Sequence, residues 1–239
     1  MMAEQDFERI WIKKLTTSLD RIAGEQIRDD VMQGSEKLSS LSERGEVIGW
    51  SKGAMERLES LVDEEHAQEI MTGCACQYPK SNLWEIKEKF AESGDIELAH
   101  QMLQEQFISF LKNTMQLSDK MIQDIVKRGW GAAGILQENG TIIATKIPKS
   151  SNLVAYIHEQ DLKKKRQYYC HCPRVRDALK LTTPLPLMYC YCGAGFYKSI
   201  WEEILQQTVK VEILKSVMTG DEVCQIAIHL PLELAGARL

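Results

Sequence analysis

Residues 134–147 have the sequence GILQENGTIIATKI, and the pattern of the chain changes at this segment. Asn139-Gly140 lies between two apolar stretches, Gly134–Leu136 and Thr141–Ile147. An Asn-Gly pair flanked by apolar runs is the strongest short-range signal of a β-hairpin, because both residues tolerate the positive φ of a tight turn. We therefore predict an antiparallel hairpin in this segment.

A second hairpin is predicted near the carboxyl end of the chain. The turn sequence Thr219-Gly220-Asp221 separates two apolar stretches, Val209–Val217 and Val223–Leu230. Four strands from two hairpins would form a mostly antiparallel sheet.

The residues before the first hairpin have helical periodicity. Apolar residues recur three or four positions apart, which is the spacing of one helix face. Ser118 is a suitable N-cap for the last helix of this region, and Gly73 and Gly129 suit helix ends. The predicted helices cover residues 6–22, 54–71, 83–90, 96–115 and 119–128.

The region between the hairpins is predicted to mix strand, loop and helix. Leu153–Ile157 is expected to be a strand, and the charged run Lys163–Arg166 a solvated loop that could instead attract an anionic substrate. Short helices are expected at Val175–Leu179 and from Phe196 onward. The fold class is therefore α+β, with an N-terminal helical layer followed by a mostly antiparallel sheet packed with helices. The expected domains are residues 1–129 and 130–239.

Composition and charge exclude several classes of protein. The 239 residues include 29 Lys and Arg and 34 Asp and Glu, a net charge of −5, which disfavours a nucleic-acid partner. No apolar run approaches the roughly 20 residues that a transmembrane helix needs. The first residues, MMAEQDFERIWIKKL, lack the apolar segment of a signal peptide. We therefore expect a cytoplasmic protein with neither nucleic-acid nor membrane partners.

The cysteines are the strongest functional signal. Six of the seven form three Cys-x-Cys pairs, namely Cys74 and Cys76, Cys170 and Cys172, and Cys190 and Cys192. Seven cysteines placed at random would give about 0.2 such pairs. Without an export signal a disulfide framework is not expected.

A Cys-x-Cys pair in an extended segment directs both sulfurs to the same side, which suits a thiolate clamp on a metal ion. The second and third pairs resemble a four-thiolate site, and the first pair would complete it or touch substrate. We expect a zinc ion, with an iron–sulfur cluster as the alternative. Redox-active or nucleophilic thiols without metal, and simple packing of buried cysteines, remain open alternatives.

Residues near these pairs are candidates for contacts with substrate. Cys190 and Cys192 precede the helix expected from Phe196, whose amino end would lower a thiol pKa. Gly193 and Gly195 would allow the backbone to approach a bound group closely. Alternation points His171 away from the two sulfurs beside it, so it is expected to contact substrate or solvent rather than metal.

Other candidates are predicted to be structural. Cys224 alternates with Ile226 and Ile228 and is expected on the core face of the last strand, where a thiol stays neutral. His158 and His229 are expected on strands as structural histidines. No two histidines are spaced as a helical metal motif would need. No catalytic residue is assigned.

The order of motifs in the last third of the chain resembles a known family. The motifs are Cys170-His171-Cys172-Pro173, the segment Tyr189–Phe196 with Trp201, and Gly220-Asp221 followed by Cys224. Residues 130–230 resemble the 4-vinyl reductase-type small-molecule-binding domain and the related L-2-amino-thiazoline-4-carboxylic acid hydrolase-like proteins, as a cysteine-rich bacterial branch. The resemblance implies an α/β sandwich-like domain with a small-ligand pocket between helices and sheet. It transfers no catalytic residue.

Two functions follow as hypotheses. In the first, the protein is a cysteine-ligated metalloprotein that acts on a small molecule in a reaction of hydrolase type. In the second, it is a non-enzymatic module that binds a small molecule or senses metal or redox state. The expected partner is a small-molecule ligand or substrate, and a homodimer is the assembly considered.

Overall fold

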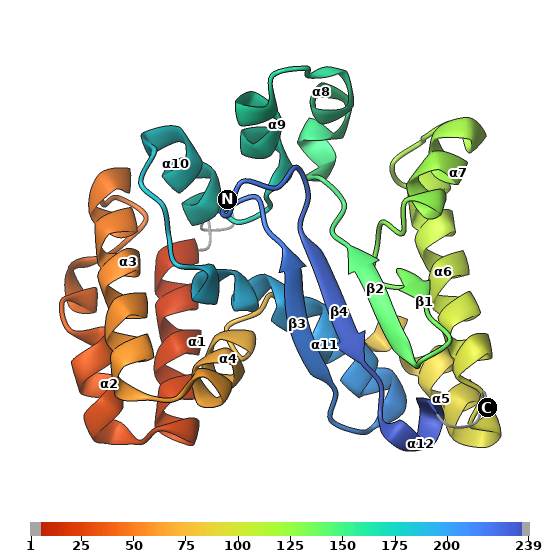
Figure 1. Ribbon diagram of the computed structural model, residues 1–239, viewed down its shortest axis with the longest axis horizontal. Helices are drawn as coiled ribbons and strands as arrows, with labels where there is room; N and C mark the ends of the chain where they lie inside the picture. Colours follow the sequence, from red (N-terminus) through yellow and green to blue (C-terminus); the bar gives the residue numbers. More distant parts are fainter. Residues whose placement is uncertain (1–5, 236–239) are drawn as a thin grey trace, which may run out of the picture.

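The computed structural model describes residues 6–235 and confirms the α+β class, with helices before a four-stranded antiparallel sheet (Figure 1). The amino-terminal helices pack side by side at one end of the molecule, on the left in Figure 1. They are α1 (Phe7–Ile22), α2 (Glu25–Met32), α3 (Arg44–Leu61) and α4 (Glu64–Thr72).

The helices α5 (Trp84–Ser93), α6 (Ile96–Asn113) and α7 (Asp119–Lys127) follow on the other side of the sheet (Figure 1). Their termini follow ordinary capping rules. Asp95 caps α6 by accepting hydrogen bonds from two backbone N–H groups, and Ser118 caps α7 as predicted.

The sheet contains the two predicted hairpins. Its strands are β1 (Ile135–Leu136), β2 (Thr141–Thr145), β3 (Lys210–Lys215) and β4 (Gln225–His229). Their order in the sheet is β1-β2-β4-β3, so the two hairpins meet where β2 pairs with β4. Asn139-Gly140 closes the first hairpin, and Gly140 has the positive φ of 77° that this turn requires.

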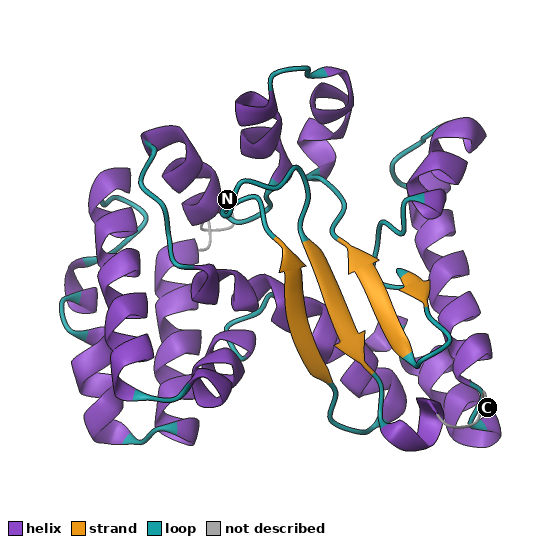
Figure 2. Cartoon of the chain, viewed as in Figure 1, coloured by secondary structure: helices purple, strands orange, loops and turns teal. Residues whose placement is uncertain are grey.

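The remaining helices lie between the hairpins and at the end of the chain. They are α8 (Leu153–His158), α9 (Leu162–Tyr169), α10 (Pro173–Leu181), α11 (Tyr191–Leu205) and α12 (Leu232–Ala235). The longest of them, α11, lies behind the sheet and packs against β3, β4, α4 and α5 (Figure 2). One continuous hydrophobic cluster extends from α1 to β4. None of the described helices is both long enough and apolar enough to cross a bilayer.

Two predicted elements are wrong in type or extent. Leu153–Ile157 forms most of α8 rather than a strand, since its buried residues, Leu153 and Tyr156, are three positions apart and face inward only in a helix. The predicted helix 54–71 is two helices, α3 and α4. The first ends at Leu61, with Val62 in an extended conformation, and Asp63 caps the second by accepting a hydrogen bond from the His66 N–H.

Two further assignments change with these corrections. His158 is the last residue of α8 and not part of a strand, while His229 lies on β4 as predicted. The run Lys163–Arg166 belongs to α9, where the Asp161 carboxylate accepts hydrogen bonds from the first backbone N–H groups. A capped start therefore makes this charged run helical.

Candidate functional site

A cavity of about 680 Å³ opens into the core between the sheet, α6, α10 and α11. Its walls are mostly apolar, and α1, together with the loop after α4, closes one side. Six of the seven cysteines contribute to the lining, namely Cys76, Cys170, Cys172, Cys190, Cys192 and Cys224. Both members of the second and third Cys-x-Cys pairs and one member of the first thus line one cavity, although the pairs are far apart in the chain.

The sheet contributes Lys146 and Cys224 to this cavity. Ile142 and Ala144 point to the buried face of β2, and Lys146 continues the same alternation one step beyond the strand. Cys224 stands in the same relation to Ile226 and Ile228 of β4. The inward-facing aliphatic residues of both strands are buried in the core, and the next inward positions, Lys146 and Cys224, line the cavity.

The Tyr169 hydroxyl holds these two strand extensions together. It donates a hydrogen bond to the Lys146 carbonyl oxygen and accepts one from the Cys224 N–H at 3.0 Å. Tyr169 is itself fully buried at the end of α9, against the ring of Tyr156. The lysine and the cysteine are therefore fixed through their backbones.

The first turns of α11 provide the opposite wall. Cys190 precedes the helix, and Gly193, Ala194 and Tyr197 follow on the face that lines the cavity. The helix begins at Tyr191 rather than at the predicted Phe196. Its Gly193 has no neighbour closer than the Lys146 Nζ, 4.0 Å from where a Cβ would lie, so space remains open between them.

Gly195 lies on the other side of α11. A Cβ at this position would be 2.1 Å from the Thr72 carbonyl oxygen, so the glycine allows α11 to pack directly on α4. Of the two glycines expected to contact substrate, Gly193 lines the cavity and Gly195 does not.

The link between α9 and α10 supplies the second cysteine pair. Cys170 is buried, and its Sγ is 3.9 Å from the Lys146 Nζ. Cys172 is the N-cap residue of α10, and its Sγ lies 3.5 Å from the Tyr189 hydroxyl. His171, between them, also lines the cavity and donates from Nε2 to the Ile147 carbonyl oxygen at 2.9 Å.

The first pair is divided between the cavity and the core. Cys76 is exposed and lines the cavity, whereas Cys74 is buried outside it and donates to the Ile70 carbonyl oxygen at 3.5 Å. The Cys192 Sγ donates to the Cys74 carbonyl oxygen at 3.4 Å, which ties the first pair to the third. All seven cysteines are free thiols in the structure.

Lys146 dominates the electrostatics of the cavity. Burial acts to lower its pKa, whereas negative charge on the neighbouring Cys170, Cys224 or Tyr197 would raise it, and with these groups ionised the net shift is upward. The ammonium form of Lys146 is therefore favoured by a negative charge beside it in the cavity. Burial beside this cation lowers the pKa of His171 to about 4, which leaves the imidazole neutral.

The pKa values of the cavity thiols differ from those predicted from the sequence. Burial, the largest cause, raises the pKa of Cys170, Cys172, Cys190, Cys192 and Cys224, and brings that of Cys192 to about 12. The position of Cys190 and Cys192 at the start of α11 therefore does not lower their pKa as predicted. The cavity thiols are neutral at rest because they face apolar walls.

The positions of the thiols bear on metal binding. In the described part of the chain, no three His, Cys, Asp or Glu side chains are grouped closely enough to hold a metal ion. Cys170, Cys190 and Cys224 nevertheless lie near enough for ionisation of one to raise the pKa of another.

Two residues of the cavity, Lys146 and Tyr197, were not predicted from the sequence. Lys146 could have been noticed because it follows Ile142 and Ala144 at the next inward-facing position of the strand.

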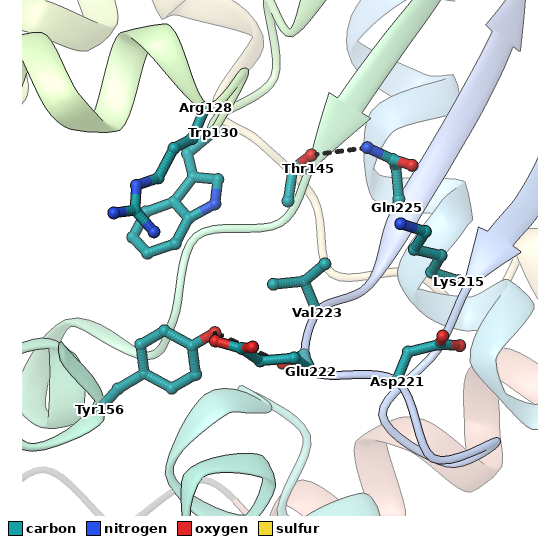
Figure 3. Close-up of a pocket in the computed structure, with 9 residues that line it drawn as sticks. All are labelled: Arg128, Trp130, Thr145, Tyr156, Lys215, Asp221, Glu222, Val223 and Gln225. Carbon is teal, nitrogen blue, oxygen red and sulfur yellow. Dashed lines mark hydrogen bonds between the residues drawn. The ribbon is translucent and has the colours of Figure 1, made fainter. Parts of the chain in front are cut away.

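A second, smaller pocket of about 340 Å³ lies at the end of the sheet (Figure 3). Arg128, Trp130, Tyr156 and Glu222 surround it with Lys215 and Asp221, and two of these charged side chains, Arg128 and Glu222, are in ion pairs. Arg128 forms an ion pair with Asp124 at 2.9 Å, and Glu222 contacts both Lys165 and the Tyr156 hydroxyl. It contains none of the predicted site residues, so the cysteine-lined cavity is the stronger candidate.

Comparison with known proteins adds one finding. Residues 118–234, just under half of the chain, match the model of a family of unknown function, DUF6144. The matched segment includes Lys146 and every cavity cysteine except Cys76. No curated protein and no solved structure matches the chain.

Proposed function

We propose that the protein binds a small, mainly apolar molecule in the cysteine-lined cavity. The observation that carries this proposal is the cavity itself, about 680 Å³ inside an otherwise continuous core. Ligand pockets in proteins are typically 300–1,000 Å³, mostly apolar, with a few polar groups, and this cavity has all three properties. An unfilled space of this size costs stability, so a binding role accounts for it.

One group of polar side chains in the cavity lies between the sheet and α11, and others come from α6 and the loop before α5, among them Asn82, Gln106 and Asn113. Lys146, Tyr197 and the thiols of Cys170 and Cys224 lie near one another, as their mutual effects on pKa require. Aromatic side chains line other parts of the wall, among them Phe107, Phe196 and Tyr78. The proposal agrees with the resemblance of residues 130–230 to the 4-vinyl reductase-type small-molecule-binding domain.

Binding of Nile red, an uncharged dye that fluoresces in apolar surroundings, tests the proposal. Ala132 lines the cavity, so Ala132→Phe would fill part of it and should weaken dye binding severalfold. Ala155→Phe places the same ring on the exposed face of α8 as a matched control. Absence of dye binding to the folded wild-type protein, or equal binding by both variants, would overturn the proposal.

A cysteine-ligated metal centre is the second candidate, because thiols from all three Cys-x-Cys pairs line the same cavity. Cys170, Cys172, Cys190 and Cys192, with Cys76 at the rim, are the donors that zinc or an iron–sulfur cluster would use. Loading would require the neutral thiols to lose protons and the side chains to move closer together. The bound metal would polarise a substrate or activate water.

Metal analysis of anaerobically purified protein, with an absorption spectrum, tests this second candidate. A band near 400 nm would indicate an iron–sulfur cluster, and a colourless protein with stoichiometric zinc would indicate a thiolate site. Metal-free protein that still binds Nile red would leave small-molecule binding as the function.

A further inference from the structure

We propose that the ligand of the cavity carries an acidic group, and that this group pairs with the ammonium of Lys146. The inference rests on the proposed small-molecule binding and assigns the chemical class of the ligand. The ligand would be an amphiphile, with an apolar body and a carboxylate or phosphate.

The charges around the cavity carry this inference. Lys146 and Lys215 are its charged lining residues, and among the described residues no aspartate or glutamate lines it. Lys146 also has no carboxylate within ion-pair distance in the described chain, unlike Lys165, which pairs with Glu222 at 2.5 Å. A cation inside an apolar cavity is costly unless an anion accompanies it.

The position of Lys146 suits it to bind a ligand. Its backbone is held by Tyr169 and by the Cys224 carbonyl oxygen, and its side chain lines the cavity with the Nζ 3.9 Å from the Cys170 Sγ. Gly193 lies on the opposite wall of the cavity and leaves space beside the Lys146 Nζ, which the side chain of any larger residue at that position would enter. The absence of a side chain at that point gives a ligand head group access to the ammonium.

The main competing partner for the ammonium is Cys170. Its sulfur is 3.9 Å from the Nζ, and an ionised Cys170 would satisfy Lys146 without a ligand. Burial raises the pKa of Cys170 more than the neighbouring lysine lowers it, so this thiol is protonated at neutral pH. A neutral thiol is only a weak hydrogen-bond partner and carries no negative charge. Lys146 therefore has no counterion among the described residues of the cavity, and an acidic ligand would supply one.

Matched ligands separate the acidic group from the apolar body. Decanoate, decyl phosphate and decanol have the same alkyl chain, and their affinities follow from displacement of Nile red. We expect Lys146→Met to weaken binding of the acids about tenfold or more, as loss of a charge-assisted hydrogen bond does, with decanol binding unchanged. Lys146→Arg should retain the preference for acids, and binding of only one of the two acids would identify the head group.

Lys163→Met, on the exposed side of α9, is the control and should bind all ligands as the wild type does. Equal affinity for acids and decanol in the wild type, or loss of acid binding in Lys215→Met but not in Lys146→Met, would overturn the inference while leaving the proposed binding function intact. Failure of every ligand and of Nile red to bind would instead overturn the proposed function. Melting temperatures of the Met and Arg variants show that each is folded.

Discussion

The backbone N–H of Lys146 donates a hydrogen bond to the carbonyl oxygen of Cys224 at 2.9 Å, so these residues face each other just beyond the paired ends of β2 and β4. The two side chains point to the same face of the sheet. Along this face, Ile142 pairs with Ile228 and Ala144 pairs with Ile226. The next positions, Lys146 and Cys224, place an amine and a thiol at the wall of the cavity.

Removing the Tyr169 hydroxyl should loosen this arrangement. Tyr169→Phe loses the hydrogen bonds to the Lys146 carbonyl and the Cys224 N–H and leaves both groups buried without that partner. We expect the free energy of unfolding to fall by about 1–3 kcal/mol in urea denaturation. Tyr168→Phe is the matched control, since the described residues offer its hydroxyl no hydrogen bond. Equal effects of the two substitutions would contradict this role.

The sheet could be predicted from sequence because its signals are local. Asn139-Gly140 and the turn at Gly220 fix two hairpins with little help from the rest of the chain. The short run Leu153–Ile157 could not be assigned in the same way, because a few apolar residues fit a strand and a helix equally well. Its helical form follows from burial of Leu153 and Tyr156 in the folded protein.

Gly195 and Gly193 should respond oppositely to alanine. Gly195→Ala forces a Cβ into the Thr72 carbonyl of α4 and should cost about 3 kcal/mol or more of stability, since neither backbone can move away easily. Gly193→Ala meets only the distant Lys146 Nζ and should gain up to about 1 kcal/mol from helix propensity. Thermal and urea unfolding of the two variants measure both. A stable Gly195→Ala protein would show that α11 and α4 are not in direct contact.

The buried pair Glu8–Arg174 should be sensitive to loss of one partner. Arg174 is fully buried, its Nε donates to the Glu8 Oε2 at 2.7 Å, and its guanidinium lies 4.0 Å from the centre of the Trp11 ring. Glu8→Gln leaves a buried charge without its counterion and should destabilise the protein by about 3–5 kcal/mol.

The exposed pair Lys210–Glu65, at 3.0 Å, provides the comparison for this measurement. Glu65→Gln should change the free energy of unfolding by less than about 1 kcal/mol, because water and salt screen the charges. If Glu8→Gln costs no more than Glu65→Gln, the buried pair contributes little to the fold.

Alkylation should distinguish Cys76 from the other thiols. Cys76 is exposed, whereas burial raises the pKa of the remaining six and that of Cys192 to about 12. With iodoacetamide at neutral pH, mass spectrometry should show Cys76 labelled first, and Cys76→Ser should abolish the rapid reaction. Raising the pH to about 9, above the ordinary thiol pKa, should leave the buried thiols slow. Rapid labelling of Cys170 or Cys190 would reveal a thiolate that the structure does not favour.

The candidate site was predictable only in part. The Cys-x-Cys spacing singled out cysteines of which five line one cavity, while Cys74 lies outside it, and the alternation of Cys224 with Ile226 and Ile228 gave the correct face of the sheet. That this face ends at a cavity depends on what α1, α6 and α11 leave unfilled, which no local pattern contains. Lys146 is a candidate site residue only because its side chain lines that cavity, which the folded structure alone reveals.

The cavity has walls from both sides of residue 118, where the family match begins. Phe7, Trp11, Cys76 and Phe107 all precede the matched segment, and Trp11 stacks on Tyr189 within it at 5.3 Å. A fragment spanning only residues 118–234 would therefore present the ligand-facing side of its sheet as an open apolar trough. Any relative that keeps this segment but changes its helical partner would reshape the pocket while keeping the second and third Cys-x-Cys pairs, so under the proposed binding function the amino-terminal half alone could change which ligand fits.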